Sequence, residues 1–220
     1  MLVLVLVLVL VLTLVRVLVL VLGAAAGPLM IGPDTGYRDA QDWLRAYLPP
    51  VAAAGQLHAV THHVYDGPGK SDYNSPSALD RGLSEIDWYT DIVTSLAPSA
   101  QIWAGEDGPI GGGNDGTCGG DKSVCGTYAS ALGYADDLAL RAKRGFAQYN
   151  RQALFGGGYG LTASPSGGLG QTSGLGRTEA LLLRPGYWVN FLWKRTLGRS
   201  VLNATSSSPM LRAYAFTGAP

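Results

Sequence analysis

The stretch QIWAGEDGPIGGG, residues 101–113, decides the fold that we predict for this chain. Its apolar first half is typical of a buried strand, and a single carboxylate, Glu106, stands where that strand should end. The glycines that follow allow a bulky ligand to lie against the backbone. Strand, acidic residue and glycine-rich loop in this order are typical of the carboxyl-terminal face of an α/β barrel, where catalytic groups collect. A surface glutamate placed there by chance is the alternative interpretation.

Strand, loop and helix units repeat on both sides of this stretch. We expect, in chain order, a strand at 29–31 with a turn at 32–34, a helix at 40–48 ended by Pro49 and Pro50, a strand at 58–65, a helix at 79–96, the strand that ends at Glu106, a helix at 128–143, a strand at 146–155, and an amphipathic helix with Trp188, Phe191, Leu192 and Trp193. Four such units predict an α/β fold, namely the second half of a TIM-type (β/α)8 barrel.

Three parts are expected along the chain. Residues 1–22 are almost only leucine and valine and are long enough to cross a bilayer as a helix, which needs about 20 apolar residues. Arg16 costs about 2.5–3.5 kcal/mol at mid-depth, which so many leucines and valines outweigh. We expect a signal or signal-anchor that leads to the secretory pathway, membrane-anchored or extracellular; an error in the gene model is the alternative. Residues 23–198 form the partial barrel, and 199–220 begin a further β-domain.

Composition limits the possible partners. The 16 Lys and Arg balance the 16 Asp and Glu, so no strong field attracts nucleic acid. Two cysteines, Cys118 and Cys125, are too few for a four-ligand zinc site. A local disulfide between them is predicted for a secreted chain, with two free thiols as the alternative. Asn203 begins an N-glycosylation sequon, which is compatible with secretion.

Several side chains around the predicted barrel mouth have two interpretations. His62 and His63 alternate along a strand, so one should face the mouth and the other should pack outward, which argues against a two-histidine metal site. Arg151 lies in an apolar strand and must be paired; it either orients a carboxylate such as Glu106 or is an internal strut. Asp107 should point away from Glu106 and cap the loop. Trp103 and Tyr159 either stack on a sugar ring or pack in the core.

A retaining glycosidase needs two carboxyl groups about 5–5.5 Å apart, one a nucleophile and one an acid/base. Glu106 suits the nucleophile. Asp34, at the end of the first predicted strand, is a weak candidate for the second, whereas Glu85 and Asp87 lie on a helix.

Five motifs together resemble glycoside hydrolase family 79, the heparanase-like β-glucuronidases, and their plant-type branch above all. They are IGPD at 31–34, THHVY at 61–65 followed by GPG, WAGE at 103–106, NRQALFGGGYGL at 150–161, and PGYW at 185–188 with LWKRTLGR at 192–199. The resemblance covers about residues 30–202. It implies that Glu106 is the nucleophile, that His62 contacts substrate, and that the backbone of Gly111 and Gly112 holds the sugar. It also implies substrate contacts at Gly158 and Tyr159, and Lys70 stands near a position where heparanase has an arginine.

The chain departs from the family pattern in three ways. Val64 stands where animal heparanases have a tyrosine that makes a hydrogen bond. The loop after Glu106 is a residue shorter. The family's Asn-Glu acid/base pair belongs to the first half of the barrel, which this chain lacks, and most of the family's downstream β-sandwich is also absent.

The resemblance therefore implies a retaining β-glucuronidase that hydrolyses O-glycosidic bonds of glucuronide-bearing polysaccharides or small glucuronides, with no cofactor and no metal. A catalytically incomplete, membrane-tethered fragment or sugar-binding relic is the alternative. A third possibility is a complementary chain that supplies the first half of the barrel.

Overall fold

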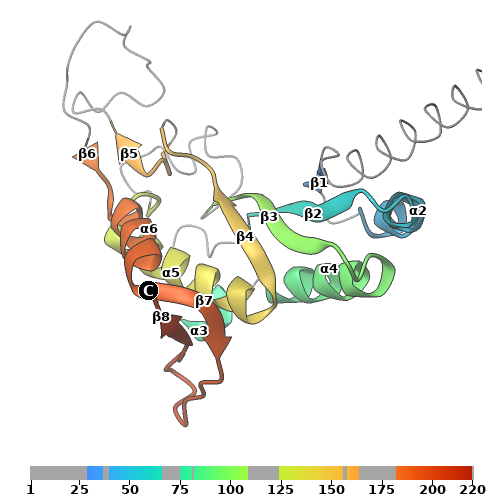
Figure 1. Ribbon diagram of the computed structural model, residues 1–220. Helices are drawn as coiled ribbons and strands as arrows, with labels where there is room; N and C mark the ends of the chain where they lie inside the picture. The colour runs from blue at the N-terminus through green and yellow to red at the C-terminus, as the bar shows by residue number, and fades with distance from the viewer. Residues whose placement is uncertain are drawn as a thin grey trace, which may run out of the picture.

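The computed structural model describes residues 29–36, 40–65, 75–80, 82–108, 124–155, 158–163 and 182–219. Its centre is a sheet of four parallel strands in the order β1-β2-β3-β4 (Figure 1). They are β1 (Met30–Thr35), β2 (Leu57–Val64), β3 (Gln101–Asp107) and β4 (Phe146–Arg151). Because neighbouring strands are parallel and consecutive in the chain, each needs a crossover connection, as in a barrel of βα units. The predicted α/β class is confirmed, and the sheet is consistent with part of a TIM-type barrel.

Helices provide the crossovers between the strands. They are α2 (Gln41–Ala53) after β1, α3 (Pro76–Leu79) and α4 (Leu83–Leu96) after β2, and α5 (Tyr128–Lys143) after β3. A pair of short antiparallel strands, β5 (Thr162–Ala163) and β6 (Leu182–Leu183), precedes α6 (Pro185–Thr196). Figure 1 shows α4 and α5 on the same side of the sheet.

The main core lies between the sheet and these helices. Leu44 and Leu48 of α2, Tyr89 and Val93 of α4, and Val60 of β2 all have completely buried side chains. In α2 and α4 the buried residues recur at the helical period, whereas four consecutive residues of β2, at 59–62, are all buried. One face of the sheet is therefore anchored in the core, which leaves the carboxyl ends of the strands to carry functional groups.

Several predicted boundaries were wrong, and one of them is the end of the strand expected over 146–155, which stops at Arg151. Helix α2 continues through Pro49 and Pro50 to Ala53. Each proline removes one backbone donor, but Leu48 is fully buried just before them and the Ala54 N–H still donates to the Pro50 carbonyl at 3.2 Å. The turn expected at 32–34 is strand, because β1 pairs with β2 as far as Thr35. The helix expected over 79–96 is divided into α3 and α4.

The C-terminal segment folds back on α5. Strands β7 (Leu197–Leu202) and β8 (Ala215–Gly218) form an antiparallel pair, so two strands occur after residue 196. Arg212 contacts Asp136 of α5 at 2.7 Å and Asp80 at 2.6 Å, and the Tyr214 hydroxyl donates to Asp136 at 2.9 Å.

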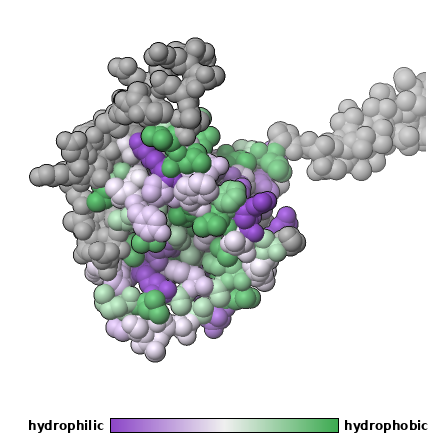
Figure 2. All heavy atoms as spheres, turned by 90° about the vertical axis from the view of Figure 1, so that its left-hand side faces the viewer, coloured by the Kyte–Doolittle hydropathy of each residue, from purple (hydrophilic) through white to green (hydrophobic). Residues whose placement is uncertain are grey.

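Hydrophobic and hydrophilic residues are mixed on the α6 side of the molecule (Figure 2). A further β-domain stays a prediction.

Residues 1–22 lie outside the described part of the chain. Within the described ranges, no helix has the length and apolar character that a membrane span requires.

Candidate active site

Glu106 lies near the carboxyl end of β3 with 35% of its side chain exposed. Its Oε1 accepts a hydrogen bond from the hydroxyl of Tyr65, the residue that directly follows β2. Burial raises the pKa of the Tyr65 hydroxyl well above its usual range, and the bond to Glu106 raises it further. Tyr65 therefore remains a protonated donor at neutral pH. One oxygen of the carboxylate is held by Tyr65, which leaves Oε2 for other partners.

His63 lies on the Oε2 side of Glu106. Its Nδ1 is 3.9 Å from Oε2, and its Nε2 is 3.0 Å from Oδ2 of Asp34 on β1. Asp34, His63 and Glu106 come from three neighbouring strands at the same end of the sheet. The structure thus places the second carboxylate considered from the sequence, Asp34, beside the same histidine as Glu106.

The strand register explains which histidine faces Glu106. His63 pairs with Glu106 across β2 and β3, whereas His62 pairs with Ala104, and an irregularity in the pairing separates the two pairs. Partners in register on adjacent strands point to the same face of a sheet. Ala104 is completely buried in the core, so His62 points into the core with it.

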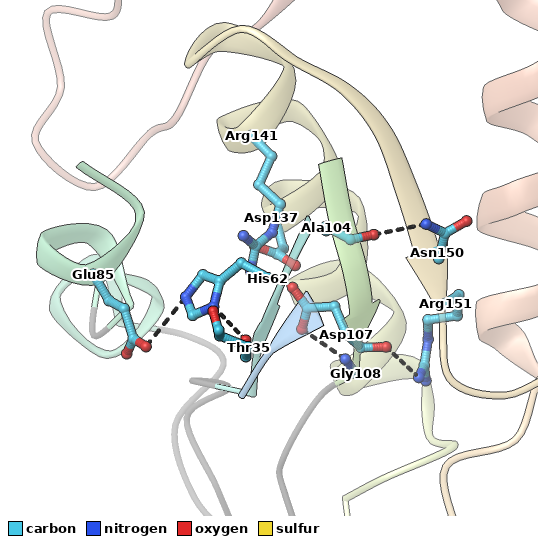
Figure 3. Close-up of polar contacts among 10 residues, drawn as sticks. All are labelled: Thr35, His62, Glu85, Ala104, Asp107, Gly108, Asp137, Arg141, Asn150 and Arg151. Atoms are coloured by element: carbon cyan, nitrogen blue, oxygen red, sulfur yellow. Dashed lines mark hydrogen bonds and ion pairs between the residues drawn. The ribbon is translucent and has the colours of Figure 1, made fainter. Parts of the chain in front are cut away.

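His62 has no exposed surface, and the substrate contact implied for it does not agree with the structure. Its Nδ1 is 2.8 Å from the Thr35 carbonyl and its Nε2 is 3.3 Å from Oε1 of Glu85 on α4 (Figure 3). The rings of Trp88 and Tyr89 lie against the imidazole, with centroids 5.8 and 4.4 Å away. His62 therefore ties β1, β2 and α4 together, and His63 is the histidine beside the candidate nucleophile.

Asp107 points away from Glu106, as the alternation predicts, but it does more than cap the loop. Its carboxylate contacts Arg141 of α5 in a fully buried ion pair, and its Oδ1 accepts from the Gly108 N–H at 2.6 Å (Figure 3). Burial raises the pKa of Asp107 well above its usual value, and the charge of Arg141 opposes that rise. Burial alone would lower the pKa of Arg141, but Asp107 and Asp137 raise it. The pair fastens the end of β3 to α5.

Arg151 acts as an internal strut in the structure. Its guanidinium donates to the carbonyls of Gln152 and Tyr159, the latter at 2.8 Å, and it lies over the ring of Tyr134. None of its described contacts reaches Glu106. By holding the Tyr159 carbonyl, Arg151 fixes the segment that brings the Tyr159 ring to 6.3 Å from the Tyr65 ring.

Two glycines allow these groups to approach closely. A Cβ on Gly105 would lie 1.7 Å from Oδ1 of Asp34, and a Cβ on Gly108 would lie 2.9 Å from both Arg151 and Tyr65. Only glycine at both positions permits this arrangement. The site therefore depends on the WAGEDG sequence beyond its acidic residues.

The sequence of this chain is similar to those of several known proteins. Residues 11–139 match the sequence model described as glycosyl hydrolase family 79, N-terminal domain. The chain belongs to glycosyl hydrolase family 79. Heparanase-like protein 2 of Arabidopsis thaliana is 31% identical to it over 196 residues, which cover 85% of this chain and 32% of that protein. Heparanase of Bos taurus is 30% identical over 187 residues, 82% of this chain and 30% of the relative.

Baicalin-beta-D-glucuronidase of Scutellaria baicalensis is 27% identical over 183 residues, covering 80% of this chain and 30% of that protein. The family 79 chain thus spans about a third of the length of the curated relatives it matches. The family resemblance noted from the sequence motifs is confirmed.

Several residues predicted for the site fall outside the described part of this family 79 chain, namely Lys70, Gly111, Gly112 and Cys118. Cys125 is disulfide-bonded, but its pairing with Cys118 stays a prediction for that reason. Gly158 is buried, and its carbonyl accepts from Arg184 at 2.6 Å. Within the described ranges, no group of three or more His, Cys, Asp and Glu could hold a metal ion.

Proposed function

We propose that this family 79 chain carries the nucleophile of a retaining, heparanase-like β-glucuronidase, and that Glu106 is that nucleophile. One observation carries the proposal: the Glu106 carboxylate lies at the carboxyl end of a parallel strand, partly exposed, with one oxygen fixed by the Tyr65 hydroxyl. Such a carboxylate suits attack on an anomeric carbon. The proposed substrates are glucuronide-containing glycans or small glucuronide conjugates.

In the proposed reaction Oε2 of Glu106 bonds to the anomeric carbon, and the glycosidic C–O bond breaks. The glycosidic oxygen leaves with the electron pair of that C–O bond and takes a proton from a general acid. Water then cleaves the glycosyl-enzyme and restores the carboxylate. Tyr65 holds Oε1 through both steps because its raised pKa keeps it protonated. We further propose that Tyr159, Gly158, Lys70, Gly111 and Gly112 line the sugar site and that Arg151 supports it from behind.

The leaving oxygen needs an acid, and the structure offers a limited choice. Within the part of the chain that the structure describes, Asp34 is the carboxylate that shares a histidine with Glu106, and it is already engaged by that histidine, His63. We therefore propose that a complementary first half of the barrel, which carries the family's Asn-Glu pair, supplies the acid. The alternative function is a sugar-binding fragment without turnover, which the engagement of Asp34 favours.

An aryl glucuronide with a good leaving group tests the proposal, because the departure of such a group depends little on protonation by an acid. The full chain should release the aryl group, and Glu106→Gln should abolish that release. A 2-fluoro glucuronide should also label Glu106, as detected by mass spectrometry. Turnover that survives in Glu106→Gln would exclude Glu106 as nucleophile. A folded chain that binds the glucuronide without turnover or labelling would favour the sugar-binding fragment.

We also propose that residues 1–22 direct the chain to the secretory pathway, where it is membrane-anchored or extracellular. The disulfide at Cys125 supports this route, since disulfides persist in oxidising compartments. The exposed position of Asn203 in its sequon supports it as well.

A further inference from the structure

We propose that Asp34 and His63 form a positioning pair for the nucleophile, in which the Asp34 carboxylate holds the His63 imidazole and His63 fixes the orientation of Oε2 of Glu106. This inference rests on the proposed function of Glu106. It assigns a role to His63, which lies beside the nucleophile, and to Asp34, which acts on the nucleophile through His63.

The distances distinguish the two halves of this arrangement. The 3.0 Å between His63 Nε2 and Asp34 Oδ2 is an ion-pair distance, although Nε2 makes no hydrogen bond in the described part of the chain. The 3.9 Å between His63 Nδ1 and Glu106 Oε2 is too long for a hydrogen bond, but it is a distance at which two charges still interact. Asp34 therefore holds the ring, and the ring acts on Glu106 through its field and its bulk.

The backbone holds Asp34 in place. Asp34 has φ +62°, in the left-handed region that few residues other than glycine adopt and that aspartate tolerates. From there its carboxylate lies over Gly105, where a Cβ would come within 1.7 Å of Oδ1. An uncommon backbone conformation and a missing side chain on the neighbouring strand thus combine to place one carboxylate against His63. Such combinations collect at functional sites.

The chemistry of imidazole explains what the pair does. A protonated imidazole carries one positive charge and a proton on each ring nitrogen, and a carboxylate only accepts hydrogen bonds. In the protonated form of His63, Nε2–H lies beside Asp34 and Nδ1–H lies beside Glu106, so both carboxylates attract the same cation. Tyr65 meanwhile holds Oε1. With a donor on one oxygen and a fixed ring edge beside the other, the carboxylate group of Glu106 is held in one orientation about its last bond.

Steady-state kinetics of the full chain on the aryl glucuronide tests the role in catalysis. We expect Asp34→Asn to lower kcat about 10-fold and His63→Gln to lower it about 10–10²-fold, with KM changed less than about 2-fold, because misplaced reacting groups cost rate. The double variant should be no slower than His63→Gln, since Asp34 acts through His63. Control variants are His58→Gln, at the opposite end of β2, and Asp42→Asn, on the exposed side of α2.

Nuclear magnetic resonance tests the geometry without activity. The nitrogen-15 shifts of His63 should change in Asp34→Asn and stay in place in Asp42→Asn. The carbon-13 signal of the Glu106 carboxyl, assigned with Glu106→Gln, should move in His63→Gln and stay in place in His58→Gln. Unchanged spectra, or additive losses of kcat in the double variant, would overturn the pair. A wild type without turnover would reject the proposed function instead, and the spectra would still decide the pair.

Discussion

Arg141 on α5 contacts Asp107, the residue directly after Glu106 on β3, and the two side chains are only 3% and 2% exposed. The chain around the candidate nucleophile is thus fastened from the core side by a buried charge pair. Asp107 also accepts from the Gly108 N–H, so the same carboxylate fixes the start of the loop (Figure 3).

Replacing Arg141 by methionine should lower the free energy of unfolding by about 3–5 kcal/mol, because the charged form of Asp107 loses its buried partner. Arg144→Met is the matched control, since Arg144 and Asp87 pair on a more exposed surface and should contribute about 0–1 kcal/mol. Urea denaturation measures both. Equal losses in the two variants would contradict this role of the buried pair.

The loss in Arg141→Met should grow with pH. Arg141 lowers the pKa of Asp107, which burial raises, so the variant should bind the Asp107 proton still more tightly when folded. The pKa of the Asp107 carboxyl is higher in the folded chain than in the unfolded chain, where it is near 3.9. The proton therefore stabilises the folded chain below pH 3.9, and this stabilisation is lost as the pH rises through the folded pKa. Urea denaturation at pH 4 and pH 8 should give the larger deficit at pH 8. A deficit that shrinks with pH would contradict this prediction.

Replacing Tyr65 by phenylalanine should lower the turnover of the aryl glucuronide about 10–10²-fold. A hydrogen bond to a charged group contributes about 1.5–3 kcal/mol, and here it holds one oxygen of Glu106. Tyr128→Phe, at an exposed position on α5, is the control and should leave turnover unchanged. If Tyr65→Phe matched the wild type, the hydrogen bond would have no part in the reaction.

Tyr89→Phe should stabilise the protein by about 1 kcal/mol. The Tyr89 hydroxyl is buried and has no hydrogen-bond partner among the described residues, and such a group costs free energy. Burial also raises the pKa of Tyr89, so wild-type stability should fall as pH rises above about 10, where unfolded tyrosines ionise first. The variant should lose less stability between pH 9 and pH 11, measured by thermal unfolding. Destabilisation by Tyr89→Phe would indicate a partner for the hydroxyl.

Gly105→Ala should destabilise the protein by about 1–3 kcal/mol, because the new methyl group needs the space that Asp34 occupies. It should also lower turnover, since Asp34 can no longer reach His63. Gly36→Ala is the control, because its Cβ would meet His63 at an ordinary 3.5 Å. Thermal unfolding and the aryl glucuronide assay together check the prediction. A fully active Gly105→Ala would show that the position of Asp34 is unimportant.

Asn203→Gln should remove one N-linked glycan from the chain when it is made in a eukaryotic secretory system. The expected result is a faster-migrating band that an amidase specific for N-glycans no longer shifts. Asn190→Gln, at an asparagine outside any sequon, should keep the wild-type pattern. An unshifted wild type would contradict the secretory route or the use of this sequon.

Local signals explain what could be predicted from the sequence. Helix α5 has the predicted bounds, since its start and end are marked within a few residues: Thr127 caps it by accepting from the Ser130 N–H, and Arg141 and Lys143 lie in its last turn. The position of Glu106 at a strand end was equally local.

Long-range features were beyond the sequence. The choice between His62 and His63 depends on an irregularity in the pairing of β2 with β3, and one such shift reverses the faces of both side chains. Asp107 and Arg141 are 34 positions apart on different elements, and no local pattern marks them as partners. The role of Tyr65 was missed for the same reason, although its place two residues after His63 puts it on the same face of an extended segment.

The order of the strands has a consequence for how this site is inherited. Asp34, His63, Tyr65 and Glu106 all come from β1, β2 and β3 or the residue after them, which are consecutive in both the sheet and the sequence. Residues 30–108 therefore contain the carboxylate, the two side chains beside it and Asp34, whereas Arg141 on α5, which anchors the end of β3, lies outside this range. Gene rearrangement at either boundary of that range would transfer these four side chains together but leave Arg141 behind, whereas a breakpoint within it would separate Glu106 from Tyr65 or His63.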